Sequence, residues 1–64
     1  MVYGFIVKKY SLRKGVPCEV LLQCGGHYTS LVEAYEDGCA AKDSIQKFYA
    51  SEHWFLKVIV TCYE

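Results

Sequence analysis

The sequence predicts one small α+β domain over residues 1–64, with the order β-β-β-α-β, a mostly antiparallel sheet and one helix packed on one face. Two stretches, residues 18–24 and 54–63, alternate apolar residues with others in the manner of strands. A third stretch, residues 41–49, repeats its apolar residues at helical spacing. A chain this short buries only about 60% of its unfolded surface, so its length supports a single domain.

The first half of the chain is expected to form strands. Residues 2–10 are rich in β-branched and aromatic side chains, and the polar stretch 11–15 ends this strand. Pro17 precedes the second strand, 18–24, because proline is tolerated at the start of a strand but not in its centre. Gly25-Gly26 follows, and glycine supplies the positive φ that tight hairpin turns require.

A third strand is predicted at about residues 27–35, and its register depends on the hairpin loop. A two-residue loop would place Val20 on the same face as Leu31 and Glu33. A three-residue loop pairs Val20 with Val32 and keeps Glu33 off the core face. Because a slip of one residue moves every side chain to the other face, the three-residue loop with a bulge is the better fit.

The second half is predicted to hold a helix and a final strand. The helix runs from about Gly38 to Ala50, with Asp37 as its N-cap, because a carboxylate there accepts hydrogen bonds from free backbone N–H groups. Residues 51–53 end the helix, and residues 54–63 form the last strand.

An alternative start for this helix is Ser30. Leu31, Ala34 and Tyr35 extend the same apolar stripe toward the N-terminus. We favour the shorter helix, because Gly38 inside the longer one would cost about 1 kcal/mol.

The face of the sheet that the helix does not cover is predicted to be unusually apolar. The expected partner-binding residues on it are Leu21, Leu31, Tyr35, Phe55, Lys57 and Ile59. The first strand, whose two faces are both apolar, adds either Tyr3, Phe5 and Val7 or Ile6 and Tyr10. A large apolar patch on a small domain marks an interface, so we expect a protein partner or a homodimer here. The alternative is that the first strand or a loop folds over this face, or that part of the sheet has a different register.

The charge balance argues against a nucleic-acid-binding domain. Seven basic and seven acidic residues give a formal net charge of zero, whereas such domains usually carry a basic excess. A local basic cluster nevertheless surrounds the first turn: Lys8, Lys9, Arg13 and Lys14. Basic side chains near aromatic rings are candidates for contact with single-stranded nucleic acid. The simpler interpretation is a solvated turn whose lysines block unwanted strand pairing.

No enzyme activity, cofactor or metal is expected. The chain has four cysteines, Cys18, Cys24, Cys39 and Cys62. Cys24 and His27 could form a nucleophile only if a third group oriented the base, and the spacings of Cys18, Cys24, His27 and Cys39 match no zinc ribbon or finger. Packing as small apolar side chains is the simplest use of these thiols, and a disulfide or a metal site is the alternative.

The compartment is expected to be the cytoplasm, which is the host cytoplasm if a phage encodes the protein. The apolar start is followed by Lys8 and Lys9 and not preceded by them, which is unlike a signal peptide. The apolar run is too short to span a membrane, and reduced cysteines suit the cytosol.

Three segments of the second half carry a resemblance to a known kind of protein. They are Val32-Glu33-Ala34-Tyr35-Glu36-Asp37, Ile45-Gln46-Lys47-Phe48-Tyr49 and Trp54-Phe55-Leu56-Lys57-Val58. This layout resembles that of small phage and prophage proteins, which include inhibitors of host RNA polymerase and anti-CRISPR proteins. The resemblance is one of pattern, so no functional residue transfers from it.

The resemblance implies a small non-enzymatic inhibitor that covers a surface of a host protein. We expect it to use the open sheet face or the edge of the final strand. The alternatives are a nucleic-acid-binding module that uses Lys8 to Lys14, and a structural homodimer.

Overall fold

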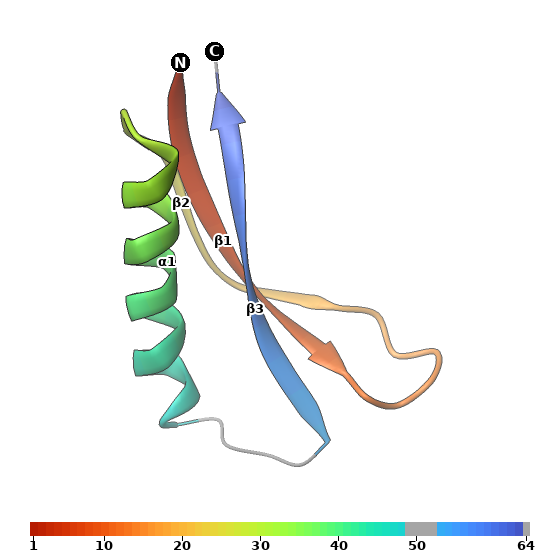
Figure 1. Cartoon of the computed structure of the whole chain (residues 1–64). Helices are drawn as coiled ribbons and strands as arrows, with labels where there is room; N and C mark the ends of the chain where they lie inside the picture. Colours follow the sequence, from red (N-terminus) through yellow and green to blue (C-terminus); the bar gives the residue numbers. More distant parts are fainter. Residues whose placement is uncertain (49–52, 64) are drawn as a thin grey trace.

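The computed structural model describes residues 1–48 and 53–63, which form a three-stranded antiparallel sheet with one helix on one face (Figure 1). The elements are β1 (Val2–Ser11), β2 (Glu19–Tyr28), α1 (Leu31–Gln46) and β3 (Trp54–Tyr63). The strand order is β2-β1-β3, so the first strand of the chain is the central one. The predicted class, a small α+β domain with one helix against an antiparallel sheet, is confirmed.

The predicted third strand at residues 27–35 is wrong, and the order is β-β-α-β. β2 continues to Tyr28, and the helix already begins at Leu31. Ser30 is its N-cap, because the Ser30 hydroxyl accepts a hydrogen bond of 3.4 Å from the backbone N–H of Glu33. The alternative start at Ser30 is therefore the observed one, and the predicted cap Asp37 lies inside the helix.

Gly25-Gly26 lies within β2 and forms no hairpin loop. Between the pairs Tyr3–Tyr28 and Phe5–Cys24, β1 contributes only one residue, Gly4, while β2 contributes residues 25–27. Gly26 has a φ of +62°, which favours glycine. A Cβ atom on Gly4 would collide with the backbone carbonyl oxygen of Cys24. These glycines therefore permit a bulge against the central strand.

The second half of the chain follows the prediction more closely. β3 spans the residues predicted for the final strand. α1 ends at Gln46, and Phe48, expected on the apolar stripe, is 85% exposed. The predicted helix end at Ala50, together with residues 51–52, lies outside the described residues. No helix in the described part of the chain is long and apolar enough to cross a membrane.

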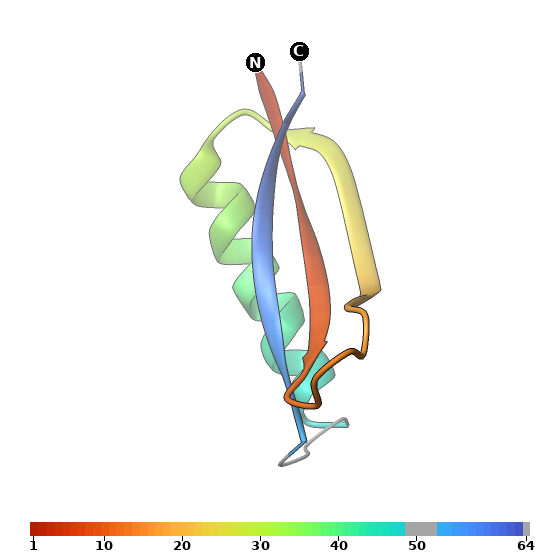
Figure 2. The same ribbon diagram turned by 90° about the vertical axis from the view of Figure 1, so that its right-hand side faces the viewer.

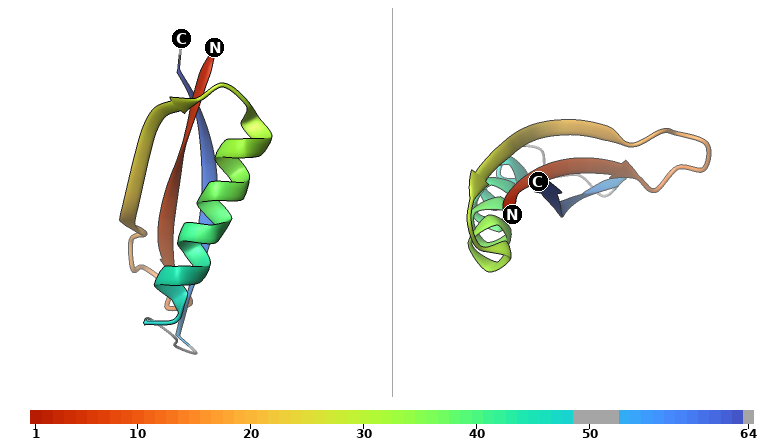
Figure 3. Two further views of the ribbon diagram at one scale, coloured as in Figure 1. Left: turned by 90° about the vertical axis from the view of Figure 1, so that its left-hand side faces the viewer. Right: turned by 90° about the horizontal axis from the view of Figure 1, so that it is seen from above.

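The core lies between α1 and the face of the sheet formed by β1 and β3 (Figure 3). Phe5 and Val7 of β1 and Leu56 of β3 are buried there. The helix presents a stripe of mostly small residues: Ala34, Gly38, Ala41 and Ile45. A Cβ atom on Gly38 would lie only 2.6 Å from Cγ1 of Val58, so the helix backbone sits directly on the sheet.

Replacing Gly38 with alanine is expected to destabilise the domain by about 1–2 kcal/mol. Overpacking a tight contact costs roughly 1–3 kcal/mol, which exceeds the gain of about 1 kcal/mol in helix propensity. Urea unfolding of the variant and of the parent protein measures the difference.

The matched control is the double variant Gly38→Ala/Val58→Ala, in which the methyl group that blocks the new Cβ is removed. Its loss of stability should be smaller than the sum of the two single losses, because residues in contact are coupled. An increase in stability from Gly38→Ala alone would show that the helix can move away from the sheet at no cost.

Candidate functional site

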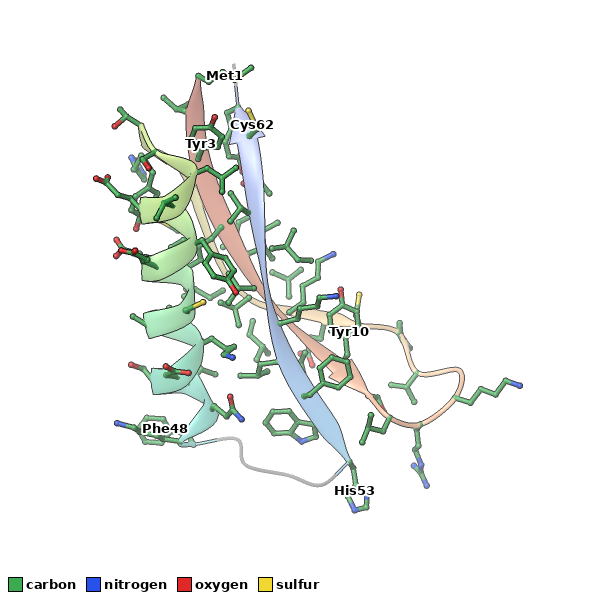
Figure 4. The ribbon with its side chains drawn as sticks, in the orientation of Figure 1. Met1, Tyr3, Tyr10, Phe48, His53 and Cys62 are labelled. Carbon is green, nitrogen blue, oxygen red and sulfur yellow. The ribbon has the colours of Figure 1, made fainter. Side chains whose placement is uncertain are left out.

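One face of the sheet is covered by α1, and no described element covers the other (Figure 2). Side chains alternate between the two faces of a strand. Since Phe5, Val7 and Leu56 are buried under the helix, the even-numbered residues of β1 and the odd-numbered residues of β3 belong to the open face. Tyr10 accordingly lies on the side of the sheet away from α1 (Figure 4).

Three directly opposed residue pairs occupy this face from its middle to the end where β3 begins. They are Ile6–Ile59, Lys8–Lys57 and Tyr10–Phe55, and we call these six residues the open-face patch. The rings of Tyr10 and Phe55 are stacked, with centroids 5.4 Å apart and an interplanar angle of 15°. Phe55 remains 46% exposed. The patch is therefore an apolar surface that is divided by a pair of lysines.

The Lys8–Lys57 pair is the unusual feature of the patch. Like charges directly opposite one another on neighbouring strands destabilise a sheet. Among the residues of β1 and β3 that belong to this face, none is acidic, so neither strand offers a carboxylate to offset the repulsion. The patch can relieve this repulsion by binding a group that carries negative charge.

The six residues predicted to bind a partner do not form one surface. Phe55, Lys57 and Ile59 lie in the open-face patch. Leu31 and Tyr35 lie on α1, because the segment expected to be a strand is helical, and both are about half exposed. Leu21 is partly buried and packs against the core cluster. The structure therefore splits the predicted surface into an open-face part and a helical part.

The sequence left open which face of the first strand joins this surface. The even-numbered residues do so, which brings Ile6 and Tyr10 to the patch together with Lys8. Lys8 had been assigned to the basic cluster, and its position opposite Lys57 depends on the pairing of β1 with β3. No feature of the sequence near residue 8 shows that pairing.

The four residues of the predicted basic cluster are separated in the structure. Lys8 belongs to the open face, whereas the Lys9 ammonium lies on the helix face, 3.6 Å from a carboxylate oxygen of Glu19 and 5.4 Å from the ring centroid of Trp54. Arg13 and Lys14 are exposed in the loop between β1 and β2. This arrangement leaves one lysine of the cluster on the open face.

The remaining candidate residues form no cluster. All four cysteines are free thiols, and Cys18 and Cys62 are exposed. Within residues 1–48 and 53–63, no group of three or more His, Cys, Asp and Glu side chains could hold a metal ion. Arg13 and His53 line a shallow hollow of about 310 Å³ at the end of the sheet where β3 begins.

Two tyrosines have raised pKa values. A side-chain hydrogen bond with Asp37 is the main cause that raises the pKa of Tyr28 to about 12, and partial burial and the negative charge of Asp37 add to it. A side-chain hydrogen bond with Cys39, one helical turn away, raises the pKa of Tyr35. The first interaction joins β2 to α1, so it also shows which flank of the helix faces β2.

Comparison of the chain with protein-family models, with curated proteins and with solved structures finds no match. The fold and the patch together define a small α+β domain with an uncovered sheet face that carries two opposed lysines between apolar pairs.

Replacing Lys57 with glutamate is expected to stabilise the domain by about 0.2–1 kcal/mol, because an opposed pair of unlike charges replaces the Lys8–Lys57 repulsion. Thermal and urea unfolding at low salt measure the gain. Lys57→Gln is the matched control and should gain less, since it removes the repulsion without adding an attraction. A loss of stability in Lys57→Glu would show that the two ammonium groups do not repel one another.

The ionisation of Tyr28 provides a test of the contact between β2 and α1. The folded pKa of about 12 lies above the ordinary value of 10.0, so this contact stabilises the fold fully below pH 10 and is lost as the pH rises through about 12. The absorbance of phenolate, compared between the parent protein and Tyr28→Phe, isolates this one titration. Asp37→Asn should move its midpoint back toward 10.0, and an unchanged midpoint would contradict the assigned cause.

Proposed function

We propose that the chain is a non-enzymatic protein-binding module that uses the open-face patch to hold an acidic and partly apolar surface of another protein. The observation that carries this proposal is the Lys8–Lys57 pair, which places two like charges directly opposite one another between an aromatic stack and an aliphatic pair. Departures from local stability rules are expected at functional sites. The preferred partner brings one or more carboxylates to the two ammonium groups and apolar side chains to both sides of them.

Free energy for such binding comes from two sources. The stacked rings and the two isoleucines supply apolar area, and the aromatic residues are of the type that dominates binding at interfaces. A carboxylate between the two lysines removes their repulsion and forms charge-assisted hydrogen bonds. The two lysines therefore determine which partner binds, and the apolar area supplies most of the binding free energy.

The inhibitor role expected from the sequence is kept as part of this proposal. A small phage-type protein that covers a surface of a host protein needs a contiguous binding face on a compact scaffold, and the open-face patch would serve as that face. Four free thiols suit the reducing cytoplasm, which we propose as the compartment.

Single-stranded nucleic acid is the second candidate ligand. Lysines beside exposed aromatic rings on a sheet can hold phosphates and stack bases. This candidate is weaker, because Tyr10 and Phe55 already stack on one another and Lys9 is engaged by Glu19. The net charge of the whole chain is also zero.

The proposed function predicts that binding depends on the patch and not on exposed apolar residues elsewhere. Affinity capture from host-cell lysate compares the parent protein with Phe55→Glu/Ile59→Glu, which places two charges in the patch. The matched control is Val32→Glu/Phe48→Glu, which makes the same change of charge at exposed apolar residues of α1 and of the turn that follows it. A partner protein should be retained by the parent and by the control but lost from the patch variant.

Two other outcomes would contradict the proposal. Equal capture by the patch variant would remove the open face from consideration. Tight binding of an unstructured oligonucleotide, with an affinity that falls steeply with salt, would favour the nucleic-acid alternative.

A further inference from the structure

The two edges of the sheet differ in how well they are protected from pairing. β2 is interrupted by two register shifts and contains Gly26 at positive φ, so its edge is irregular. β3 pairs with β1 through ten consecutive residues without a shift, contains no glycine or proline, and carries one charged residue, Lys57. Natural proteins usually blunt such long regular edges, because the unpaired N–H and C=O groups recruit another strand. The outer edge of β3, next to which no strand of the described residues lies, is therefore competent to pair.

An apolar flank of the helix lies above this edge. Leu31, Tyr35 and Cys39 recur every four residues and so share one side of α1. The opposite flank carries Asp37, which interacts with Tyr28 of β2, so the flank with Leu31 faces the β3 side. Figures 2 and 3 show α1 crossing the sheet obliquely, with its first turns, which carry Leu31 and Tyr35, on the β3 side and its last turns over β1. Leu31 is 53% and Tyr35 51% exposed, and no described element packs against this flank beyond β3.

We propose that a second copy of the chain pairs with this edge, β3 against β3 in antiparallel orientation, around a two-fold axis perpendicular to the sheet. This inference concerns a different surface from the open-face patch and goes beyond the proposed function. The centre of α1 lies over the middle of the β1–β3 pair, because a Cβ atom on Gly38 would meet both Val58 and Phe5. A two-fold axis beside the middle of β3 therefore also brings the middles of the two helical flanks together. A strand from another protein could pair with the edge of β3 alone. A second copy related by the two-fold axis presents its own β3 edge to this edge and its own apolar helical flank to this flank.

The spacing of the elements fits this arrangement. Opposed residues of an antiparallel pair point to the same face, so both helices lie on one face of a six-stranded sheet. α1 lies over β1 and β3, and strands are about 4.8 Å apart, which places the two helix axes roughly 10 Å from one another. Packed helices are separated by about 8–10 Å. The new contact would bury Leu31 and Tyr35 of both copies.

Charge favours one register of the pairing. With Ile59 on the axis, Lys57 stands opposite Thr61 of the second copy, and the two Lys57 residues lie about 14 Å apart along the strands. With Val58 on the axis they would be diagonal neighbours about 7–8 Å apart, so the register centred on Ile59 is the one proposed. The formal net charge of zero gives no long-range repulsion between copies. The assembly would place two open-face patches on the same side of one continuous sheet.

Cys39 lies near the proposed axis and serves as a probe of it. With Cα atoms about 2.3 Å from each helix axis, two Cys39 Cα atoms would come within about 5–6 Å, the range of a disulfide. A variant that keeps only Cys39 (Cys18→Ser, Cys24→Ala and Cys62→Ser) should form a covalent dimer with a mild oxidant or a short bis-maleimide. The matched variant that keeps only Cys62 should not, since its thiols would lie about 20 Å apart.

The decisive experiment joins this cross-linking to sedimentation equilibrium of the parent protein, of Leu31→Lys/Tyr35→Lys and of Phe55→Glu/Ile59→Glu. We expect a dimer that is cross-linked through Cys39 and weakened by about tenfold or more in the helix variant, because repulsion then enters the interface. A monomer at all concentrations would overturn the proposal. A dimer that the patch variant disperses, without cross-linking at Cys39, would overturn it too. Because Leu31→Lys/Tyr35→Lys leaves the open-face patch intact, capture of a partner protein by this variant tests the proposed function separately.

Discussion

The close approach of α1 to the sheet at Gly38 is the constraint on which the other features depend. Among the described residues, only a few apolar side chains are buried, namely those of Phe5, Val7, Leu56 and Ala34, so the core is densely packed only if helix and sheet nearly touch. Ala34 and Gly38 allow this because they add almost no side chain between the backbones. A single helix held in this way covers one face only. The other face of the sheet and the helical flank beside β3 are exposed because the described chain has one helix and three strands and no further element to cover them.

Most of the fold could be predicted from local patterns, and the failures have physical causes. β1 agrees with its β-branched and aromatic content and β3 with its alternation, and the α+β class follows from them together with one helical stripe. The sequence predicts too late a helix start because Gly38 lowers the helix propensity of the longer alternative, whereas its missing side chain is what the packing requires. Likewise, Gly25-Gly26 supplies positive φ as expected, but to a bulge against Gly4. At Gly38 and at Gly25-Gly26, tertiary packing outweighs the local conformational preference of glycine.

The candidate site was only half accessible to sequence reasoning. Phe55, Lys57 and Ile59 could be placed on one face, because a strand with strict alternation fixes its own faces. The matching residues of β1 could not, since Ile6, Lys8 and Tyr10 alternate with side chains that are equally apolar. Only the pairing of the first strand with the last one decides which set is buried. The opposed lysines are therefore a property of the register, which lies beyond any local pattern.

The central position of β1 also affects how the domain is made. β1 must pair with β3, and residues 12–53 separate the two strands along the chain. Contacts between residues so distant in sequence close large loops, which slows folding relative to a helical domain of equal size. On the ribosome, β1, β2 and α1 all emerge before β3, which pairs with β1 and adds Leu56 to the core beside Phe5 and Val7, is available. The domain must therefore complete its core after synthesis of β3, and until then the apolar surface of β1 is open to chaperones and to other nascent chains.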